Sequence, residues 1–225
     1  MPRVARGLAG NSVYHVLNRG NGRQQVFHKH RDYEAFINLM KQAKERYSVK
    51  ISAYCLMPNH FHMVVMPDKG EQLSRWMQWL MTSHVRRYHR HHGSSGHIWQ
   101  GRFKSFVIEK DEHLLMVLRY VEGNPVRAGL VQSAKEWLWS SHNERIHKSN
   151  DSLIDAVQIE LPANWDRYVD RPLTEEELEG LRQSVNRQSP YGETEWQIKT
   201  TRELGLESTI RARGRPRKGQ EDDRN

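Results

Sequence analysis

The sequence predicts an α+β fold, in which a split βαβ arrangement forms an antiparallel sheet with helices packed on one face. Alternating apolar residues predict strands at 12–18, 49–57, 60–66 and 98–109. Apolar residues at three- and four-residue spacing predict helices between them, so the order is β, α, β, β, α, β, α. Only Pro58 and Asn59 separate the second and third strands, which are therefore expected to pair.

The helices are located by their apolar stripes and end signals. The first helix is expected from Asp32 and the second over 73–88. Asp111 suits the N-cap of a third helix, which Asn124-Pro125 should end. Beyond residue 141 the chain is polar, with helices expected near 174–186, where Thr174 and Glu177 form a capping box, and near 192–204. This pattern predicts a body over 1–144, a helical accessory extension over 145–210 and a basic, disordered tail over 211–225.

The chain has 225 residues, and its positive charge lies mainly in the body. Lys and Arg number 35 against 27 Asp and Glu, which gives a net charge of +8. Residues 1–144 hold 21 basic and 11 acidic side chains, whereas the rest holds 14 and 16. A basic body predicts an acidic partner, with nucleic acid ahead of a membrane surface.

Several classes of protein are disfavoured by composition. The single cysteine, Cys55, excludes a disulfide framework and a cysteine-rich zinc module. No apolar stretch approaches the roughly 20 residues of a membrane span, and the first residues lack the apolar core of a secretory signal. We expect a cytoplasmic protein with no membrane partner.

The first chemical signal is the pair His60 and His62. In a strand, residues two apart share a face, so the two imidazoles project together while Phe61 points to the core. Two adjacent imidazoles form half of a divalent-metal site. The alternative is two ordinary histidines in a chain that has 13.

The second signal is Tyr120 with Asn124 on the third helix. Four residues apart, they stack on one side of the helix, and Tyr120 falls outside the Leu114/Leu118 core stripe. Asn124 is therefore a candidate third ligand. The alternative is a tyrosine half-covered by the sheet edge, followed by an asparagine that ends the helix.

Four sequence blocks together resemble the REP-associated tyrosine transposases, a branch of the single-tyrosine HUH transposases. The blocks are PNHFHMVV (58–65), GHIWQGRFKS (96–105), RYVEGNPVRAGLV (119–131) and WLWSS (137–141). The resemblance covers about residues 12–142. It implies a ferredoxin-like catalytic domain that cleaves single-stranded DNA at hairpin-forming palindromic repeats.

The resemblance also implies the role of each site residue. His60, His62 and Asn124 would hold Mg²⁺ or Mn²⁺, and Tyr120 would form a covalent 5′-phosphotyrosine intermediate. Members of the wider group carry glutamine where this chain has Asn124, which is one methylene shorter. His113 is a further candidate, as the base for Tyr120.

Basic residues interleaved with aromatic rings suit single-stranded DNA, because charge follows the backbone and rings stack on bases. The candidates in the body are Arg86, Arg87, Trp99, Arg102, Phe103, Lys104 and Arg127. At the C-terminal end, Arg213, Arg215 and Arg217 surround a Gly-Arg-Pro core that resembles an AT-hook. A generic basic tail is the alternative there.

Three functions remain open from the sequence. An active DNA endonuclease and strand transferase is favoured, in the bacterial cytoplasm and associated with the nucleoid. A non-cleaving DNA-binding regulator on the same scaffold is second. A metal-dependent hydrolase of another substrate is third, because it leaves the basic body unexplained. We expect a monomer, with a dimer as the alternative.

Overall fold

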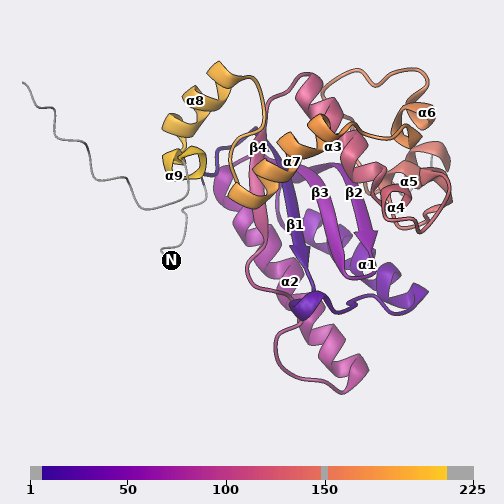
Figure 1. Cartoon of the computed structure of the whole chain (residues 1–225). Helices are drawn as coiled ribbons and strands as arrows, with labels where there is room; N and C mark the ends of the chain where they lie inside the picture. Colours follow the sequence, from indigo (N-terminus) through magenta and orange to yellow (C-terminus); the bar gives the residue numbers. More distant parts are fainter. Residues whose placement is uncertain (1–6, 148–151, 212–225) are drawn as a thin grey trace, which may run out of the picture.

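The computed structural model describes residues 7–147 and 152–211, with a four-stranded antiparallel sheet at its centre (Figure 1). The strands lie in the order β2-β3-β1-β4, and each neighbouring pair is antiparallel. They are β1 (Val13–Arg19), β2 (Val49–Met57), β3 (His60–Pro67) and β4 (Lys104–Ile108). With one helix after β1 and one after β3, the succession is the ferredoxin-like βαββαβ. The predicted α+β class and the pairing of the second and third strands are confirmed.

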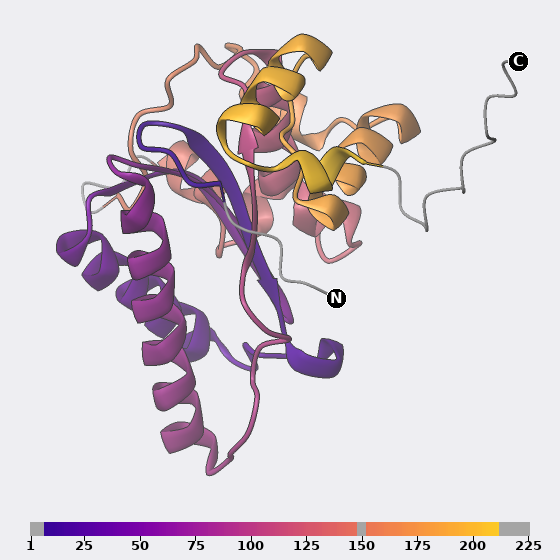
Figure 2. The same ribbon diagram turned by 90° about the vertical axis from the view of Figure 1, so that its left-hand side faces the viewer.

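One face of the sheet is covered by α1 (His30–Arg46) and α2 (Gly70–His92), which lie together in Figure 2. Alternate residues of β3, Phe61 and Met63, point into this layer and are fully buried. They belong to one apolar cluster with Phe36, Leu73 and Trp76 from the two helices. Both helices follow the apolar stripes predicted from the sequence.

The third helix, α3 (Glu112–Glu122), covers the opposite face, so the expectation that the helices lie on one face is wrong for it. The reason is the composition of the strands, which are apolar on both faces. Val64 and Met66 of β3 are buried against Leu114 and Leu118 of α3. A sheet with two apolar faces requires cover on both. Asp111 caps α3 as predicted, and its side chain accepts a hydrogen bond from the His113 amide.

The fourth strand is shorter than the predicted 98–109. Over residues 98–103 the backbone forms an isolated bridge between Trp99 and Gly20, and the Gly101 carbonyl accepts a hydrogen bond from the Asn18 side chain of β1. Gly101 has a φ of 151°, a conformation that side chains disfavour, and here the backbone departs from regular strand geometry. The strand proper therefore begins only at Lys104.

The remaining elements are short helices. They are η1 (Asn21–Arg23), α4 (Asn124–Arg127), η2 (Ala134–Glu136), α5 (Ser141–His147), α6 (Trp165–Asp170), α7 (Glu175–Arg187), α8 (Thr194–Glu203) and α9 (Glu207–Ile210). The capping box of Thr174 and Glu177 at the start of α7 is formed as predicted. The helices expected near 174–186 and 192–204 correspond to α7 and α8.

The described part of the extension packs on the sheet. Trp165 and Leu181 belong to the same apolar cluster as α3. At the free edge of β4, the Tyr191 amide donates to the Val107 carbonyl and the Glu109 amide donates to the Tyr191 carbonyl. At the other edge, β2 is bonded to Trp139 and Asp155. The division at residue 144 stays a prediction, and 212–225 lie outside the described residues.

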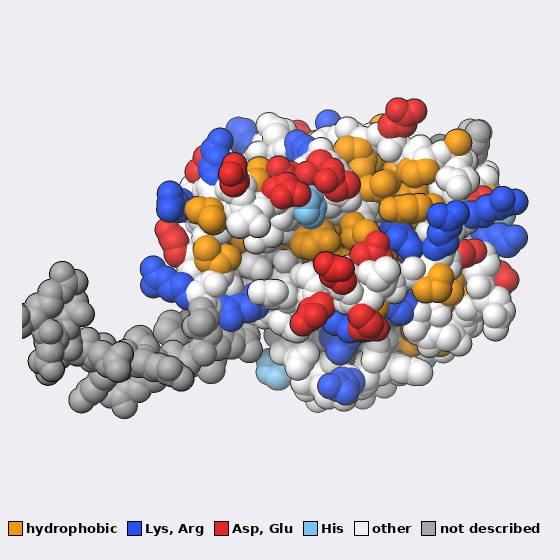
Figure 3. All heavy atoms as spheres, turned by 45° about the horizontal axis from the view of Figure 1, so that its top comes forward, with side chains coloured by type: hydrophobic (Ala, Val, Ile, Leu, Met, Phe, Trp, Pro, Cys, Tyr) orange, Lys and Arg blue, Asp and Glu red, His pale blue; other side chains and the backbone are white. Residues whose placement is uncertain are grey.

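The surface of the described part is largely polar. Its exposed large apolar side chains are Leu130, Leu138, Ile198 and Ile210. On the face seen in Figure 3, acidic side chains gather near the middle and basic ones lie mainly toward its sides. Among the residues the structure describes, no helix combines the length and apolar character that crossing a bilayer requires.

A buried carboxylate fixes the end of α3. Glu122 is fully buried and accepts hydrogen bonds from Ser141 Oγ (2.5 Å), Arg145 Nε (2.8 Å) and Trp165 Nε1 (2.7 Å), while His142 Nδ1 lies 3.1 Å away. Burial alone would raise the pKa of Glu122. The hydrogen bond from His142 and the charge of Arg145 outweigh burial and lower the pKa to about 2. The group is therefore an ionised carboxylate that ties α3 to α5 and α6.

We expect Glu122→Gln to lower the free energy of unfolding by about 3 kcal/mol at pH 7, because the charge of Arg145 loses its partner. Urea denaturation measures this. The exposed Glu179→Gln is the matched control and should change stability by about 0.5 kcal/mol or less. An unchanged midpoint for Glu122→Gln would contradict the interpretation.

The same substitution should also change how the free energy of unfolding depends on pH in the acid range. A lowered folded-state pKa stabilises the protein fully above the usual glutamate pKa of about 4.3, and this stabilisation is lost as the pH falls. The gap in stability between the original chain and Glu122→Gln should therefore narrow as the pH falls to about 2. Denaturation curves across this range measure the gap.

Candidate active site

His60 and His62 project from β3 toward the face that α3 covers. Phe61, between them, is buried in the opposite cluster, as strand alternation predicts. The two imidazole rings are nearly perpendicular, and their centroids are 5.1 Å apart. His62 is buried and His60 half-buried, so the pair lies where the sheet surface begins to open to solvent.

Tyr120 reaches this pair from α3. Its ring is half-buried and stands edge-on to His62, with 5.6 Å between the ring centroids. The guanidinium carbon of Arg127 lies 4.1 Å from the centroid of the Tyr120 ring, and its two terminal nitrogens donate to the Tyr120 carbonyl. A phenol is thus held between a neutral imidazole and a cation.

Sequence reasoning missed His15, which is fully buried in β1. His15 Nε2 and His62 Nδ1 are 2.8 Å apart in a hydrogen bond, and the two rings are stacked. Burial lowers the pKa of His15 to about 3, so this ring is neutral. The signal available in the sequence was the alternation of β1, which puts His15 on the same face as His62 once the strands are paired.

Both histidines of the pair are oriented through Nδ1. His60 Nδ1 donates to Asn59 Oδ1 at 2.6 Å, and His62 Nδ1 is bonded to His15. Within the described residues, neither Nε2 atom has a hydrogen-bond partner. Burial, followed by the charges of Arg19 and Arg127, lowers the pKa of His60 to about 4. Burial is the main cause that lowers the pKa of His62 well below its usual value, and the electrostatic effect of the adjacent His15 adds to it.

These features suit metal ligation. A neutral imidazole is the form that binds a metal, and ligating histidines ordinarily have the second ring nitrogen fixed by a hydrogen bond. When Nδ1 of His62 donates to His15, its Nε2 keeps the lone pair that a metal requires. The residues present therefore fit a divalent ion held by two Nε2 atoms.

Asn124 lies just beyond α3, at the first position of α4 after a break at Gly123. It is buried, and within the described residues its carboxamide forms no hydrogen bond. The Gly123 amide donates to the Arg119 carbonyl, so Asn124 follows directly after the C-cap of α3. Its place as a third ligand stays a prediction. His113 Nδ1 is bonded to Asp111 at 2.9 Å, and the role of His113 as base stays a prediction.

A basic groove adjoins the two histidines. Leu17 of β1 pairs with both His62 and Lys104, so these residues share one face of the sheet. A cavity of about 410 Å³ opens here, lined by Leu17, Asn18, Arg19, Gln100, Gly101, Arg102, Lys104, Val185 and Asn186. The last two residues come from α7, so the extension forms one wall of the groove. Arg102 and Lys104 are exposed in this groove, and their contact with DNA stays a prediction.

Two predicted DNA-binding aromatics lie elsewhere. Trp99 and Phe103 are buried in the cluster beneath α1 and α2. The Trp99 ring contacts Phe61 edge-on at 5.2 Å between centroids. A ring buried in the core has no face on which a base can stack, so the prediction for both residues is wrong. Phe103 alternates with Arg102 and Lys104, so its ring lies in the core while the two charged side chains face the groove.

Of the other described residues predicted to contact DNA, one lies near the histidine pair and the rest do not. Arg127 lies at Tyr120, as described above. Arg86 and Arg87 lie on α2, which covers the other face of the sheet from His60 and His62. Arg213, Arg215 and Arg217 fall outside the described residues.

Comparisons with known proteins cover this same part of the chain. The family described as Transposase IS200 like matches residues 9–124. A Haemophilus influenzae protein that carries the name of a REP-associated tyrosine transposase is 28% identical over 121 residues, which are 49% of this chain and 69% of that protein. The REP-associated tyrosine transposase of Escherichia coli K12 is 22% identical over 141 residues, or 62% and 81% of the two chains.

A solved structure shares the fold. It is described as a REP-associated tyrosine transposase bound to a REP hairpin and matches with a TM-score of 0.56 at 18% identity, covering 77% of this chain and all of that one. The family match extends from the start of β1 through α3, over more than half of the chain, and it includes the histidine pair, Tyr120 and Asn124. The chain therefore belongs to the family of IS200-like transposases, DNA-processing enzymes whose REP-associated branch its sequence resembles.

Proposed function

We propose that this protein cleaves and rejoins one strand of DNA at hairpin-forming repeats, with Tyr120 as the nucleophile. The observation that carries the proposal is the edge-on approach of the Tyr120 ring to His62, at 5.6 Å between centroids. A half-buried phenol beside two neutral imidazoles and a basic groove is suited to attack on a phosphodiester. The hairpin in the description of the structural neighbour supports the same class of substrate.

In the proposed reaction the Tyr120 oxygen forms a bond to phosphorus while the bond to the 3′ oxygen breaks. The phenol loses its proton, the leaving oxygen gains one, and the products are a 5′-phosphotyrosine and a free 3′-hydroxyl. Attack by a 3′-hydroxyl on the phosphotyrosine reverses these changes and joins strands without ATP. The Arg127 guanidinium beside the ring favours the negative charge that develops on the phenol oxygen and the phosphate.

His60 and His62, through their Nε2 atoms, and Asn124 are the residues that would hold the divalent ion. Mg²⁺ or Mn²⁺ bound there would polarise the scissile phosphate and offset its negative charge. The donor set is neutral, so it leaves the ion's charge available to phosphate, and its two nitrogens favour Mn²⁺. His15 and Asn59 act as positioning residues, because each fixes the Nδ1 of one imidazole.

Tyr120→Phe should abolish covalent attachment to DNA. The assay incubates labelled hairpin DNA and Mn²⁺ with the protein, and a band resistant to denaturation marks the adduct. Tyr88→Phe is the matched control, because its hydroxyl bonds to His28 on the helical layer across the sheet. An adduct that survives in Tyr120→Phe would overturn the nucleophile assignment.

The same assay distinguishes DNA cleavage from the alternative function, DNA binding without cleavage. A chain that binds the hairpin tightly and leaves it uncut with Mg²⁺ and with Mn²⁺ would favour the non-cleaving regulator. The presence of the histidine pair beside Tyr120 argues for cleavage.

His62→Ala should weaken Mn²⁺ binding at least tenfold, because one of two nitrogen donors is removed. Electron paramagnetic resonance of free Mn²⁺ measures the affinity. His97→Ala is a matched control, since this histidine is exposed in a loop before β4. Equal affinities in the two variants would exclude His62 as a ligand.

Replacing Arg102 and Lys104 together with alanine should weaken single-strand binding and reduce the slope of log K against log salt by about 1.4, for two phosphate contacts. The matched pair is Arg86→Ala with Arg87→Ala on α2, which should change the slope less. Fluorescence anisotropy between low and moderate salt measures both. If the α2 pair has the larger effect, DNA follows α2 rather than the groove.

A further inference from the structure

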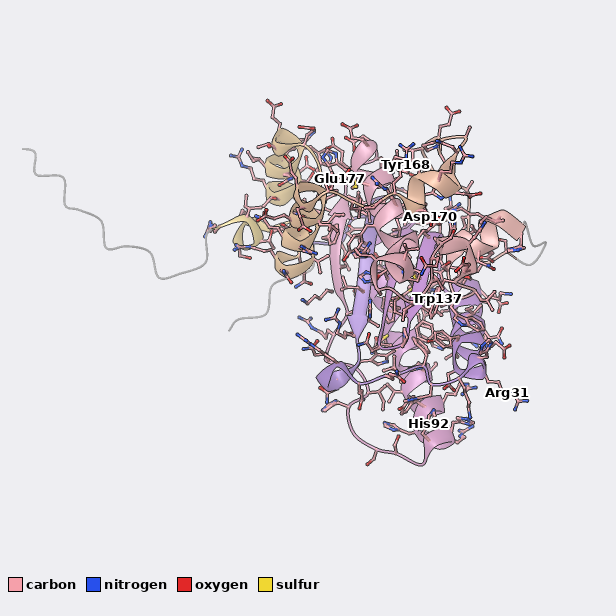
Figure 4. The ribbon with its side chains drawn as sticks, turned by 45° about the vertical axis from the view of Figure 1, so that its right-hand side comes forward. Arg31, His92, Trp137, Tyr168, Asp170 and Glu177 are labelled. Carbon is pink, nitrogen blue, oxygen red and sulfur yellow. The ribbon has the colours of Figure 1, made fainter. Side chains whose placement is uncertain are left out.

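A second group of metal-binding side chains lies in the helical layer on the other face of the sheet. The start of α1 and the end of α2 meet there, and Figure 4 labels Arg31 near the first and His92 near the second. Asp32 comes from the first turn of α1, and His91 and His92 are the last two residues of α2. None of these residues takes part in the function proposed above.

Asp32 is a buried carboxylate at a helix start. Its Oδ2 accepts hydrogen bonds from the amides of His28 (3.0 Å) and Lys29 (3.3 Å), and His92 Nε2 lies 3.8 Å from the same oxygen. The carboxylate side chain is only 6% exposed. The Asp32 carboxylate at the start of α1 therefore lies next to the imidazole of His92, the last residue of α2.

Further rings surround His92. Its ring centroid is 5.0 Å from that of His28 and 4.9 Å from that of His91. Tyr88 lies 4.3 Å away by the same measure, and its hydroxyl is bonded to His28 Nε2 at 2.8 Å. The two imidazoles at the end of α2 therefore lie near one carboxylate, and the rings of His28 and Tyr88 pack against His92.

A small cavity opens among these groups. It measures about 10 Å³, and Asp32, His84, Tyr88 and His92 contribute to its lining. The Nδ1 atom of His84, a residue only 4% exposed, is buried here and has no hydrogen-bond partner within the described residues. An unpartnered buried nitrogen beside a polar cavity is a place where a ligand or a metal-bound water gains a hydrogen bond.

We propose that Asp32, His91 and His92 form a binding site for Zn²⁺ or a similar transition-metal ion. One ligand atom from each residue lies within 4.8 Å of the others. Ligand atoms around tetrahedral Zn²⁺ are about 3.4 Å apart, so small rotations of the His91 and His92 rings would bring the three ligand atoms to this spacing. Two imidazole nitrogens and one carboxylate oxygen are donors that Zn²⁺ takes, with water as the fourth.

The ion would clamp the first turn of α1 to the last turn of α2. The chain leaves α2 through the 93–103 loop and then enters the basic groove at Arg102 and Lys104. A bound ion would therefore fix the origin of that loop. The role is structural and independent of the site at His60 and His62.

The test uses the full-length chain with His60→Ala and His62→Ala, which silences the first site whether or not it binds metal. Titration with Zn²⁺ against a chromophoric chelator should show one equivalent bound. Adding His91→Ala and His92→Ala should weaken that binding at least tenfold, whereas adding His97→Ala should leave it unchanged. Because His91 and His92 are exposed, the fold should persist, and circular dichroism checks this.

Visible absorption of bound Co²⁺ gives an independent readout, since tetrahedral coordination yields intense bands. The bands should appear in the His60→Ala/His62→Ala protein and weaken in the milder variant His92→Gln. Absence of Zn²⁺ binding in the first protein, or undiminished binding after loss of His91 and His92, overturns the proposal.

Discussion

The arrangement of the site depends on the buried carboxylate of Glu122. Tyr120 lies two residues before it and Asn124 two residues after it, so the network that fixes Glu122 also fixes the backbone that presents both. Its four partners come from α5 and α6, beyond the strands of the sheet. An ionised group in the interior is stable only while all of its partners are in place. The position of the tyrosine is therefore coupled to the packing of segments that carry no chemistry themselves.

The sheet divides its residues by face. Odd-numbered residues of β1 and even-numbered residues of β3 carry His15, His60 and His62, and their neighbours in sequence fill the core under α1 and α2. One face is therefore packed under α1 and α2, whereas the other combines apolar packing against α3 with the imidazoles. The cost of burying imidazoles is limited because they remain neutral and bond to one another. The same alternation in 102–104 puts cations in the groove and Phe103 in the core.

Much of the fold could be predicted, because strand alternation, helical stripes and capping signals are local. The strands, the capping box at Thr174 and the shared face of His60 and His62 all follow from residues close in sequence. The missed features depend on contacts between distant segments. His15 acquires its meaning only from the β1–β3 register, and α7 becomes a wall of the groove only after packing on β4. Trp99 and Phe103 point into the core, a direction that neither family resemblance nor aromatic character determines.

The covering of both sheet edges has a consequence for biosynthesis. Trp139 and Asp155 bond to β2, and Tyr191 bonds to β4, yet all three are made after the last strand is complete. When β4 has just left the ribosome, the sheet can form, but both of its edge strands still lack the segments that cover them. Such edges are templates for pairing with other chains. For this protein the β4 edge stays uncovered until Tyr191, about five sixths of the way along the chain, has left the ribosome.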